Sequence, residues 1–215
     1  LKGCNKLEGL TLTGFTNVTK TIGNNFLQDC TSLETLVMTN WTKLTSIGNY
    51  FCDGCTSLSS VNISNCSLLA TINVGFLNNC SALQTLRMEN LAKLTSIPYN
   101  FCAYKYNLRS VYIKNWTAIQ TIPDDFLYLC SSLTTFQDFT GMNSLKTIGD
   151  TFLGNCWNLT GTFSKLNNLG ALKEIGKNFL YKCTGLTRLS FQNRTGLTSI
   201  GTYFCDYCSG LTAID

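Results

Sequence analysis

Cysteine is the residue type of this chain that is best suited to chemistry. The 215-residue sequence contains 12 cysteines and no histidine. Two C-x-x-C pairs are present, Cys52 with Cys55 and Cys205 with Cys208. This spacing allows a local disulfide or half of a four-ligand zinc site. Because histidine is absent, Ser-His-Asp and Cys-His catalytic arrangements and mixed Cys/His zinc sites are excluded.

The cysteines belong to an internal repeat with a period of about 25 residues. Each of eight units contains an isoleucine and, four residues later, a phenylalanine. The phenylalanines are Phe26, Phe51, Phe76, Phe101, Phe126, Phe152, Phe179 and Phe204. Four residues further on comes a cysteine, which only the fourth unit replaces, by Lys105, and three residues later a leucine. We number the units one to eight from these phenylalanines.

The repeat explains most of the cysteines. Eight of them occupy the repeated position, if the first, Cys4, is included. Three more, Cys52, Cys102 and Cys205, stand where other units have leucine. We therefore predict that the cysteines pack as small apolar side chains. The two C-x-x-C pairs lie six units apart, or roughly 29 Å at the strand spacing of a sheet, so they cannot share one zinc ion. A disulfide within either pair remains an alternative.

Each unit is predicted to contain two short strands and a helical segment. Alternating apolar residues such as Leu36 and Met38 predict a strand with polar residues on its outward side. Asparagines close this strand, where their amides can bond the turn and the next coil; they are Asn40, Asn65, Asn90, Asn115 and Asn193. The second strand ends at the isoleucine, and a glycine then marks a tight turn. The segment around the phenylalanine is predicted to form one or two turns of helix, which Asp124 and Asp125 cap in unit five.

Stacking of the units is required because one unit cannot bury its own apolar face. In-register stacking places isoleucine on isoleucine and phenylalanine on phenylalanine, and these columns form the predicted core. Units six and seven contain extra residues, in the segments 135–144 and 157–172. We expect a bulge or a loop in these segments.

The pattern resembles the leucine-rich repeats of the BspA-like family, which occur in surface proteins of bacteria and parasitic protists. The resemblance covers the chain from Cys4 to Ile214 and departs from the family where Asn73, Pro98 and Pro123 replace the turn glycine. It implies an α/β repeat solenoid, a leucine-rich repeat stack of about eight ~25-residue units. Parallel strands would form one face, with short strands and helical turns on the others. It also implies a binding module and supplies no catalytic residues, so we expect no enzyme, no cofactor and no bound metal.

The domain organisation expected from the repeat is a single solenoid over residues 1–215. The sequence begins inside a unit and stops at the strand of the next one. Since repeat arrays need capped ends for solubility, we expect a fragment of a longer chain, with end-on contacts to flanking repeats or to neighbouring molecules.

Composition and charge narrow the expected partners. The net charge of +4 is too small to favour nucleic acid, and no apolar run approaches the ~18 residues of a membrane span. We expect a protein partner, with glycan or extracellular matrix as further candidates. No acidic residue lies between Glu89 and Asp124, a stretch rich in basic and tyrosine residues. The candidate partner contacts are Arg87, Tyr104, Tyr106, Arg109, Tyr112 and Lys114. Glu89 and Lys114 are expected to be lateral neighbours and to pair with each other.

Two functions fit these features. The first is a non-catalytic binding or adhesion module of a cell-surface or secreted protein, which the family resemblance favours. The alternative is a structural scaffold subunit of a cytoplasmic assembly, which unoxidised cysteines and the lack of a visible signal sequence favour.

Overall fold

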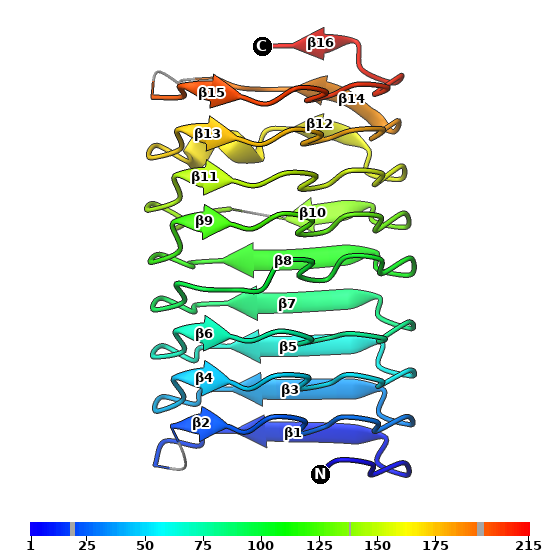
Figure 1. Ribbon diagram of the computed structural model, residues 1–215, viewed down its shortest axis with the longest axis vertical. Coiled ribbons are helices and arrows are strands. Elements are labelled where there is room, and N and C mark those ends of the chain that lie inside the picture. Colours follow the sequence, from blue (N-terminus) through cyan, green and yellow to red (C-terminus); the bar gives the residue numbers. More distant parts are fainter. Residues whose placement is uncertain (18–19, 138, 193–195) are drawn as a thin grey trace.

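The computed structural model describes residues 1–17, 20–137, 139–192 and 196–215. Its largest sheet has six parallel strands stacked along the long axis of the molecule (Figure 1). They are β1 (Gly9–Thr13), β3 (Thr35–Thr39), β5 (Ser60–Ser64), β7 (Thr85–Glu89), β8 (Ser110–Lys114) and β10 (Thr135–Gln137). Equivalent residues of successive units pair across the sheet, for example Leu36 with Val61 and Val61 with Leu86. The predicted in-register stack of parallel strands is confirmed.

A second layer of two-residue strands lies at the isoleucines and forms two separate sheets. The first contains β2 (Thr21–Ile22), β4 (Ser46–Ile47) and β6 (Thr71–Ile72). The second contains β9 (Thr121–Ile122), β11 (Thr147–Ile148), β13 (Glu174–Ile175) and β15 (Ser199–Ile200). Between them, unit four contributes only an isolated bridge from Ser96 to Thr71. Pro98 and Pro123 flank this break, and proline lacks the N–H that Gly48 donates to Ile22 O at 2.8 Å in a regular unit.

The extra residues of unit seven produce the predicted irregularity. A third sheet contains β12 (Gly161–Phe163), β14 (Leu186–Leu189) and β16 (Ala213–Ile214). The pairing of β12 with β14 shifts register between Gly161 and Thr162, and a short 3-10 helix, η1 (Lys165–Asn168), follows β12. The other predicted irregularity, at 135–144, includes residue 138, which lies outside the described residues.

The segments around the phenylalanines differ from the predicted helical turns. They are successive turns in which left-handed residues recur, such as Asn25 at φ 57° and Asp29 at φ 61°. Alternate amides of the segment bond the next coil, as when Leu27 N–H donates to Phe51 O at 2.8 Å, and others close turns within the segment, as when Gln28 N–H donates to Asn25 O at 3.2 Å. Since a helix needs bonds to the residue four positions earlier, this ladder between coils replaces it. In the described part of the chain, η1 is the only helix.

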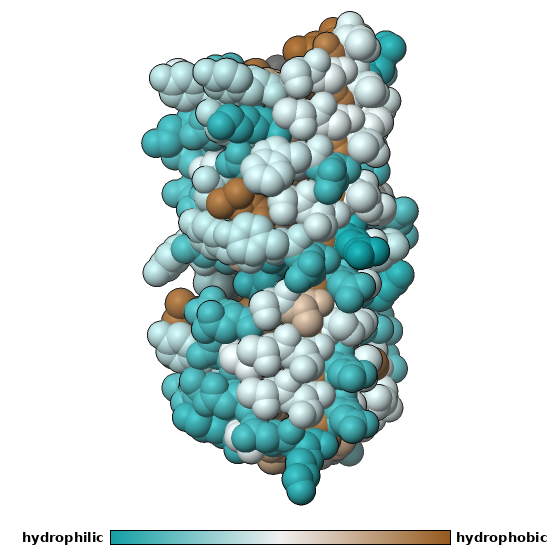
Figure 2. Space-filling view, turned by 90° about the vertical axis from the view of Figure 1, so that its right-hand side faces the viewer, coloured by the Kyte–Doolittle hydropathy of each residue, from teal (hydrophilic) through white to brown (hydrophobic). Residues whose placement is uncertain are grey.

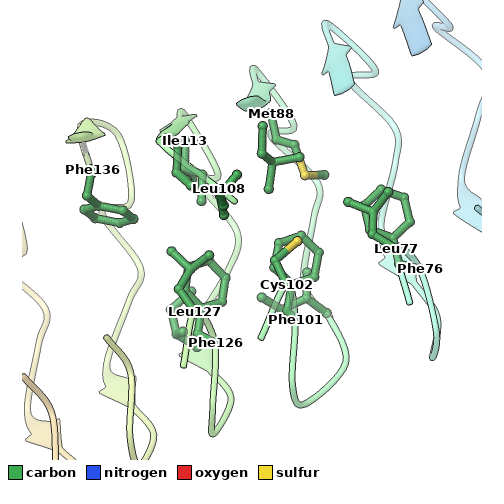
Figure 3. Close-up of a cluster of buried hydrophobic side chains, with 14 of the residues drawn as sticks. Phe76, Leu77, Met88, Phe101, Cys102, Leu108, Ile113, Phe126, Leu127 and Phe136 are labelled. Carbon is green, nitrogen blue, oxygen red and sulfur yellow. The ribbon is translucent and has the colours of Figure 1, made fainter. Parts of the chain in front are cut away.

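The phenylalanines form one continuous stacked row through the core. All eight take part, and neighbouring ring centroids lie 5.2–5.8 Å apart with interplanar angles of 3–11°. Figure 3 shows Phe76, Phe101 and Phe126 in this row, opposite Met88, Ile113 and Phe136 from the long strands. The interior is thus built from columns of equivalent side chains, as predicted from the repeat.

The glycine after the isoleucine is required by close packing between coils. A Cβ on Gly176 would lie 2.5 Å from the carbonyl carbon of Gly149 and 2.5 Å from Asp150 Oδ1. Gly176 does not adopt a left-handed φ, so the predicted tight turn is not what selects glycine. The adjacent carboxylates bridge the coils: Asp124 Oδ1 accepts a hydrogen bond from Asp150 N–H at 2.8 Å. Asp124 therefore joins two coils, and the cap that we predicted for a helix start is absent because no helix starts there.

The asparagines that close the long strands form a ladder of side-chain amides. Asn65, Asn90 and Asn115 each donate from Nδ2 to the Oδ1 of the preceding asparagine, at 3.1, 2.7 and 2.6 Å. Asn40 begins the ladder, and all four have φ between 57° and 62°. The left-handed conformation, which asparagine tolerates better than most residues, turns the chain out of the strand. Asn193, predicted to belong to this column, lies outside the described residues.

Candidate interaction surfaces

Arg87 and Tyr112 form the centre of the predicted contact patch on the large sheet. They are register partners on β7 and β8, and the guanidinium carbon of Arg87 lies 4.6 Å from the centroid of the Tyr112 ring. Arg87 Nη1 also donates to Glu89 Oε2 at 2.7 Å. Glu89 and Lys114 are lateral neighbours as predicted, but the ion pair of Glu89 is with Arg87. Lys114 is exposed, and the structure gives it no ion pair among the described residues.

The other three candidate residues are divided between two places. Arg109 is exposed and immediately precedes β8, so it lies at the edge of the same sheet. Tyr104 and Tyr106 lie on the preceding turn, where they line a hollow of about 370 Å³ together with Asn79. Partial desolvation, with Asp125 close by, raises the pKa of Tyr104, so its phenol stays protonated at neutral pH. The six candidates therefore belong to two surfaces, a sheet patch and a turn hollow.

A cluster of tyrosines on the turns of units five to eight was not identified from the sequence. Tyr128, Tyr181, Tyr203 and Tyr207 line a groove of about 400 Å³. Lys182 Nζ lies 5.2 Å from the Tyr181 ring centroid and 5.7 Å from that of Tyr207. The sequence does contain a signal for this cluster. Tyr128 and Tyr181 both stand two residues after the phenylalanine of their unit, so the repeat places them at equivalent positions.

Figure 2 shows the face of the molecule that is formed by the loops preceding the long strands. Hydrophilic side chains and side chains of intermediate hydropathy cover most of this face, and strongly apolar ones are confined to scattered spots. Eight of the nine tyrosines lie in turns, and Tyr112 is the exception. The turns thus offer aromatic rings within a polar surface, a composition that suits recognition of another macromolecule.

The repeated cysteines satisfy a backbone carbonyl of the preceding coil. Six thiols donate to the carbonyl of the residue that follows the preceding unit's phenylalanine, at 3.0–3.4 Å. They are Cys55, Cys80, Cys130, Cys156, Cys183 and Cys208. A thiol combines the volume of a small apolar side chain with a weak donor. This combination explains why cysteine, rather than alanine or valine, recurs at the position.

All twelve cysteines are free thiols in the structure. Burial raises the pKa of Cys102 and Cys130 to about 12, and it also raises the pKa of Cys66 and Cys156. Protonated thiols are poor nucleophiles and poor metal ligands. In the part of the chain that the structure describes, no group of three or more potential ligands could hold a metal ion.

Native protein is expected to react with a thiol reagent mainly at two positions. Cys4 and Cys205 are half-buried, whereas the other ten cysteines are buried. The hydrogen bond between Cys205 and Cys208 raises the pKa of Cys205 and lowers the pKa of Cys208, so this pair is expected to react once. We expect brief iodoacetamide treatment to add two labels to the native chain, one at Cys4 and one at this pair, and twelve to the denatured, unreduced chain, as counted by intact mass. Fewer than twelve labels after denaturation would reveal a disulfide. Rapid labelling of many more than two thiols in native protein would contradict the burial of the column.

The comparisons with known proteins agree with the repeat and the fold. A family model described as BspA type leucine rich repeat region (6 copies) matches residues 1–134 and 95–215. The two matches together span the chain, which therefore belongs to the BspA-type leucine-rich repeat family. This family and fold indicate a protein-interaction module and are typically non-catalytic. Among the described residues, no helix is long and apolar enough to cross a membrane.

One solved structure of a bacterial protein shows a similar fold at low sequence identity. A leucine rich cell surface protein from Faecalibacterium prausnitzii A2-165 is 17% identical with a TM-score of 0.51, and the match covers 99% of this chain and 62% of that one. A leucine-rich repeat protein from Bacteroides ovatus ATCC 8483 is 20% identical with a TM-score of 0.46, over 96% and 65% of the two chains. The chain thus spans less than two thirds of the length of either protein. A comparison with curated proteins gave no match.

Proposed function

We propose that this chain is a protein-binding adhesion module of a cell-surface or secreted protein. The observation that carries the proposal is the Arg87–Tyr112 pair on the outward face of the large sheet. Arginine and tyrosine dominate the binding energy of many interfaces, and both side chains here are held by neighbours. Glu89 fixes the guanidinium from one side and the Tyr112 ring fixes it from the other.

The surroundings of this pair suit a flat protein surface. The neighbouring outward residues are small, such as the polar Asn62 on β5 and the apolar Val37 on β3. The flanking exposed charges are Arg109 and Lys114, and both are basic. A partner with acidic residues around an apolar centre would complement this patch.

Charge reversal tests the proposal. The probe is a plate coated with basement-membrane extract, and the readout is retention of the labelled chain. We expect the double variant Arg109→Glu/Lys114→Glu to bind about tenfold more weakly, which corresponds to about 1.4 kcal/mol. Lys173→Glu, an exposed lysine outside the large sheet, is the matched control and should bind as the unaltered chain does. Protease treatment of the coat should remove binding, whereas glycosidase treatment should not. Equal retention of both variants would remove the sheet patch from the proposal.

A scaffold role inside the cell is the second candidate, and the twelve free thiols favour it, because thiols persist in reducing compartments. An antibody raised against the chain distinguishes the two functions. We expect it to label intact cells of the source organism, which supports the surface module. Labelling that requires permeabilised cells would support the scaffold instead.

A further inference from the structure

Lys105 is a buried cation that stands where every other unit has cysteine. The residue is only 7% exposed, and its Nζ donates to Ala103 O at 3.1 Å. An ammonium group has three N–H donors, so two donors remain beyond this bond. None of the ion pairs formed by the described residues includes Lys105. Burying a charge without a counter-charge is energetically unfavourable. We therefore expect a negative or polar group that stabilises the ammonium.

The nearest ionisable groups do not supply a negative charge. Lys105 lies close enough to Cys80, Cys102 and Cys130 for its charge to lower their pKa, but other effects outweigh it. Burial holds the pKa of Cys102 and of Cys130 at about 12, and the pKa of Cys80 is raised as well. These thiols are therefore neutral at neutral pH, and the ammonium has no thiolate partner.

The backbone ladder between coils is interrupted at the same place. In a regular pair of units, amides such as Cys52 N–H donate to the next coil, here to Phe76 O at 3.0 Å. The equivalent amides of unit three belong to Gly75, Leu77 and Asn79, and none of them donates to a backbone acceptor. Buried backbone N–H groups are almost always paired with protein, water or a ligand. Gly75 and Leu77 are buried, whereas Asn79 is exposed and can bond to solvent. Two buried amides without backbone acceptors next to a buried ammonium thus indicate an occupant.

Lys105 and Cys102 are the residues that alter the ladder. Asn79 N–H would meet Ala103 O in the regular pattern, but Lys105 Nζ bonds that carbonyl instead. Cys102 adopts a left-handed conformation with φ 56°, whereas the equivalent residues of the other described units do not have a positive φ. The N–H of Cys102 also has no backbone acceptor. Figure 3 shows Leu77 and Cys102 on adjacent coils.

A cavity of about 100 Å³ lies between these two coils. Gly75, Leu77, Cys102 and Lys105 all line it, so three residues whose amides lack a backbone acceptor and the residue whose ammonium lacks a counter-charge meet at one space. Its volume matches roughly three water molecules at about 30 Å³ each, or one small anion. Backbone amides together with a lysine form the donor set that binds anions in other proteins.

We propose that this cavity is a binding site for a small inorganic anion, held by the Lys105 ammonium and the free amides of Leu77 and Cys102. The anion supplies the missing counter-charge and accepts the hydrogen bonds that the interrupted ladder leaves open. Its binding energy contributes to the stability of the junction between units three and four. The site is separate from the sheet patch and does not depend on the adhesion proposal.

Thermal unfolding with added anion tests the site. The unaltered chain and Lys105→Cys, which restores the residue of the other units, are compared in a buffer of bulky anions with chloride or phosphate as the probe. For the unaltered chain we expect a rise in Tm that grows with the logarithm of the anion concentration and reaches about 5–10 °C at one hundred times the dissociation constant. Lys105→Cys should lose this rise. Lys93→Cys, an exposed lysine, should keep it. An equal rise in all three proteins would overturn the proposal, because it would reflect a general salt effect.

Amide chemical shifts of the unaltered chain give a second test that needs no variant. In a ¹⁵N-labelled sample we expect the Leu77 and Cys102 amides to shift saturably with the same anion, while equivalent amides such as Leu127, bonded to Phe152 O, stay unchanged. Unshifted Leu77 and Cys102 amides at saturating anion would show that water alone fills the cavity, and this result would also overturn the proposal.

Discussion

Replacement of Phe126 by alanine is expected to lower the free energy of unfolding by about 3–5 kcal/mol. The Phe126 ring is fully buried and stacks between Phe101 at 5.3 Å and Phe152 at 5.4 Å. Its removal leaves a cavity in the middle of the row, which the rigid coils above and below cannot fill. Urea denaturation followed by the fluorescence of the buried Trp116 measures the loss.

The matched control for this substitution is Phe204→Ala. Phe204 occupies the equivalent position of unit eight, but it is only half-buried and has a stacking neighbour of the row on one side, Phe179 at 5.2 Å. We expect less than half the loss found for Phe126→Ala, because less apolar surface is returned to water. Equal losses would show that stability does not come from the continuity of the row.

The second large effect is expected from Gly176→Ala, which should lower the free energy of unfolding by about 1–3 kcal/mol through overpacking. The new Cβ would lie 2.5 Å from the Gly149 carbonyl carbon, an atom that cannot move without its coil. It would also displace Asp150, whose Oδ1 accepts a hydrogen bond from Lys177 N–H at 2.9 Å. The midpoint of urea denaturation reports the change.

Gly23→Ala is the control because it changes the same repeat position in unit one. No atom lies within 4 Å of a Cβ built on Gly23, and its φ is not left-handed. We expect the free energy of unfolding to stay unchanged or to rise by up to about 1 kcal/mol, since alanine restricts the unfolded chain. If Gly23→Ala were as destabilising as Gly176→Ala, the cause would be local backbone conformation and not contact between coils.

The core and the strand register were predictable because they depend on spacing alone. A constant period places Phe101 over Phe76 and Tyr112 beside Arg87 without any knowledge of side-chain conformation. The strand register therefore also predicted where on the sheet the patch around Arg87 and Tyr112 lies. The ion pair of Glu89 depends instead on which way its side chain turns, and register alone did not show that Arg87 would be its partner.

The helical turns were wrongly predicted because a helix and a series of consecutive turns can both bury apolar residues that are four positions apart. Phe26 and Cys30 are four residues apart, which places both on one face of a helix, but consecutive turns can also bury both. The contrary signal was present in Asn25 and Asp29, residue types that tolerate the left-handed conformation observed there. Once a helix was assumed, the turn tyrosines could not be placed, and the groove around Tyr128 and Tyr181 was missed.

The interruption between units three and four has a mechanical consequence. On one side of the rod, β7 and β8 stay joined by five register pairs. On the opposite side, only the isolated bridge between Thr71 and Ser96 joins units three and four in the layer of short strands, and the amides of Gly75, Leu77 and Asn79 lack backbone acceptors in the next coil. A bending force should therefore open this junction before any regular one, with the β7–β8 pair as the hinge. The molecule would then behave as two stiff segments of unequal length with one compliant joint between them.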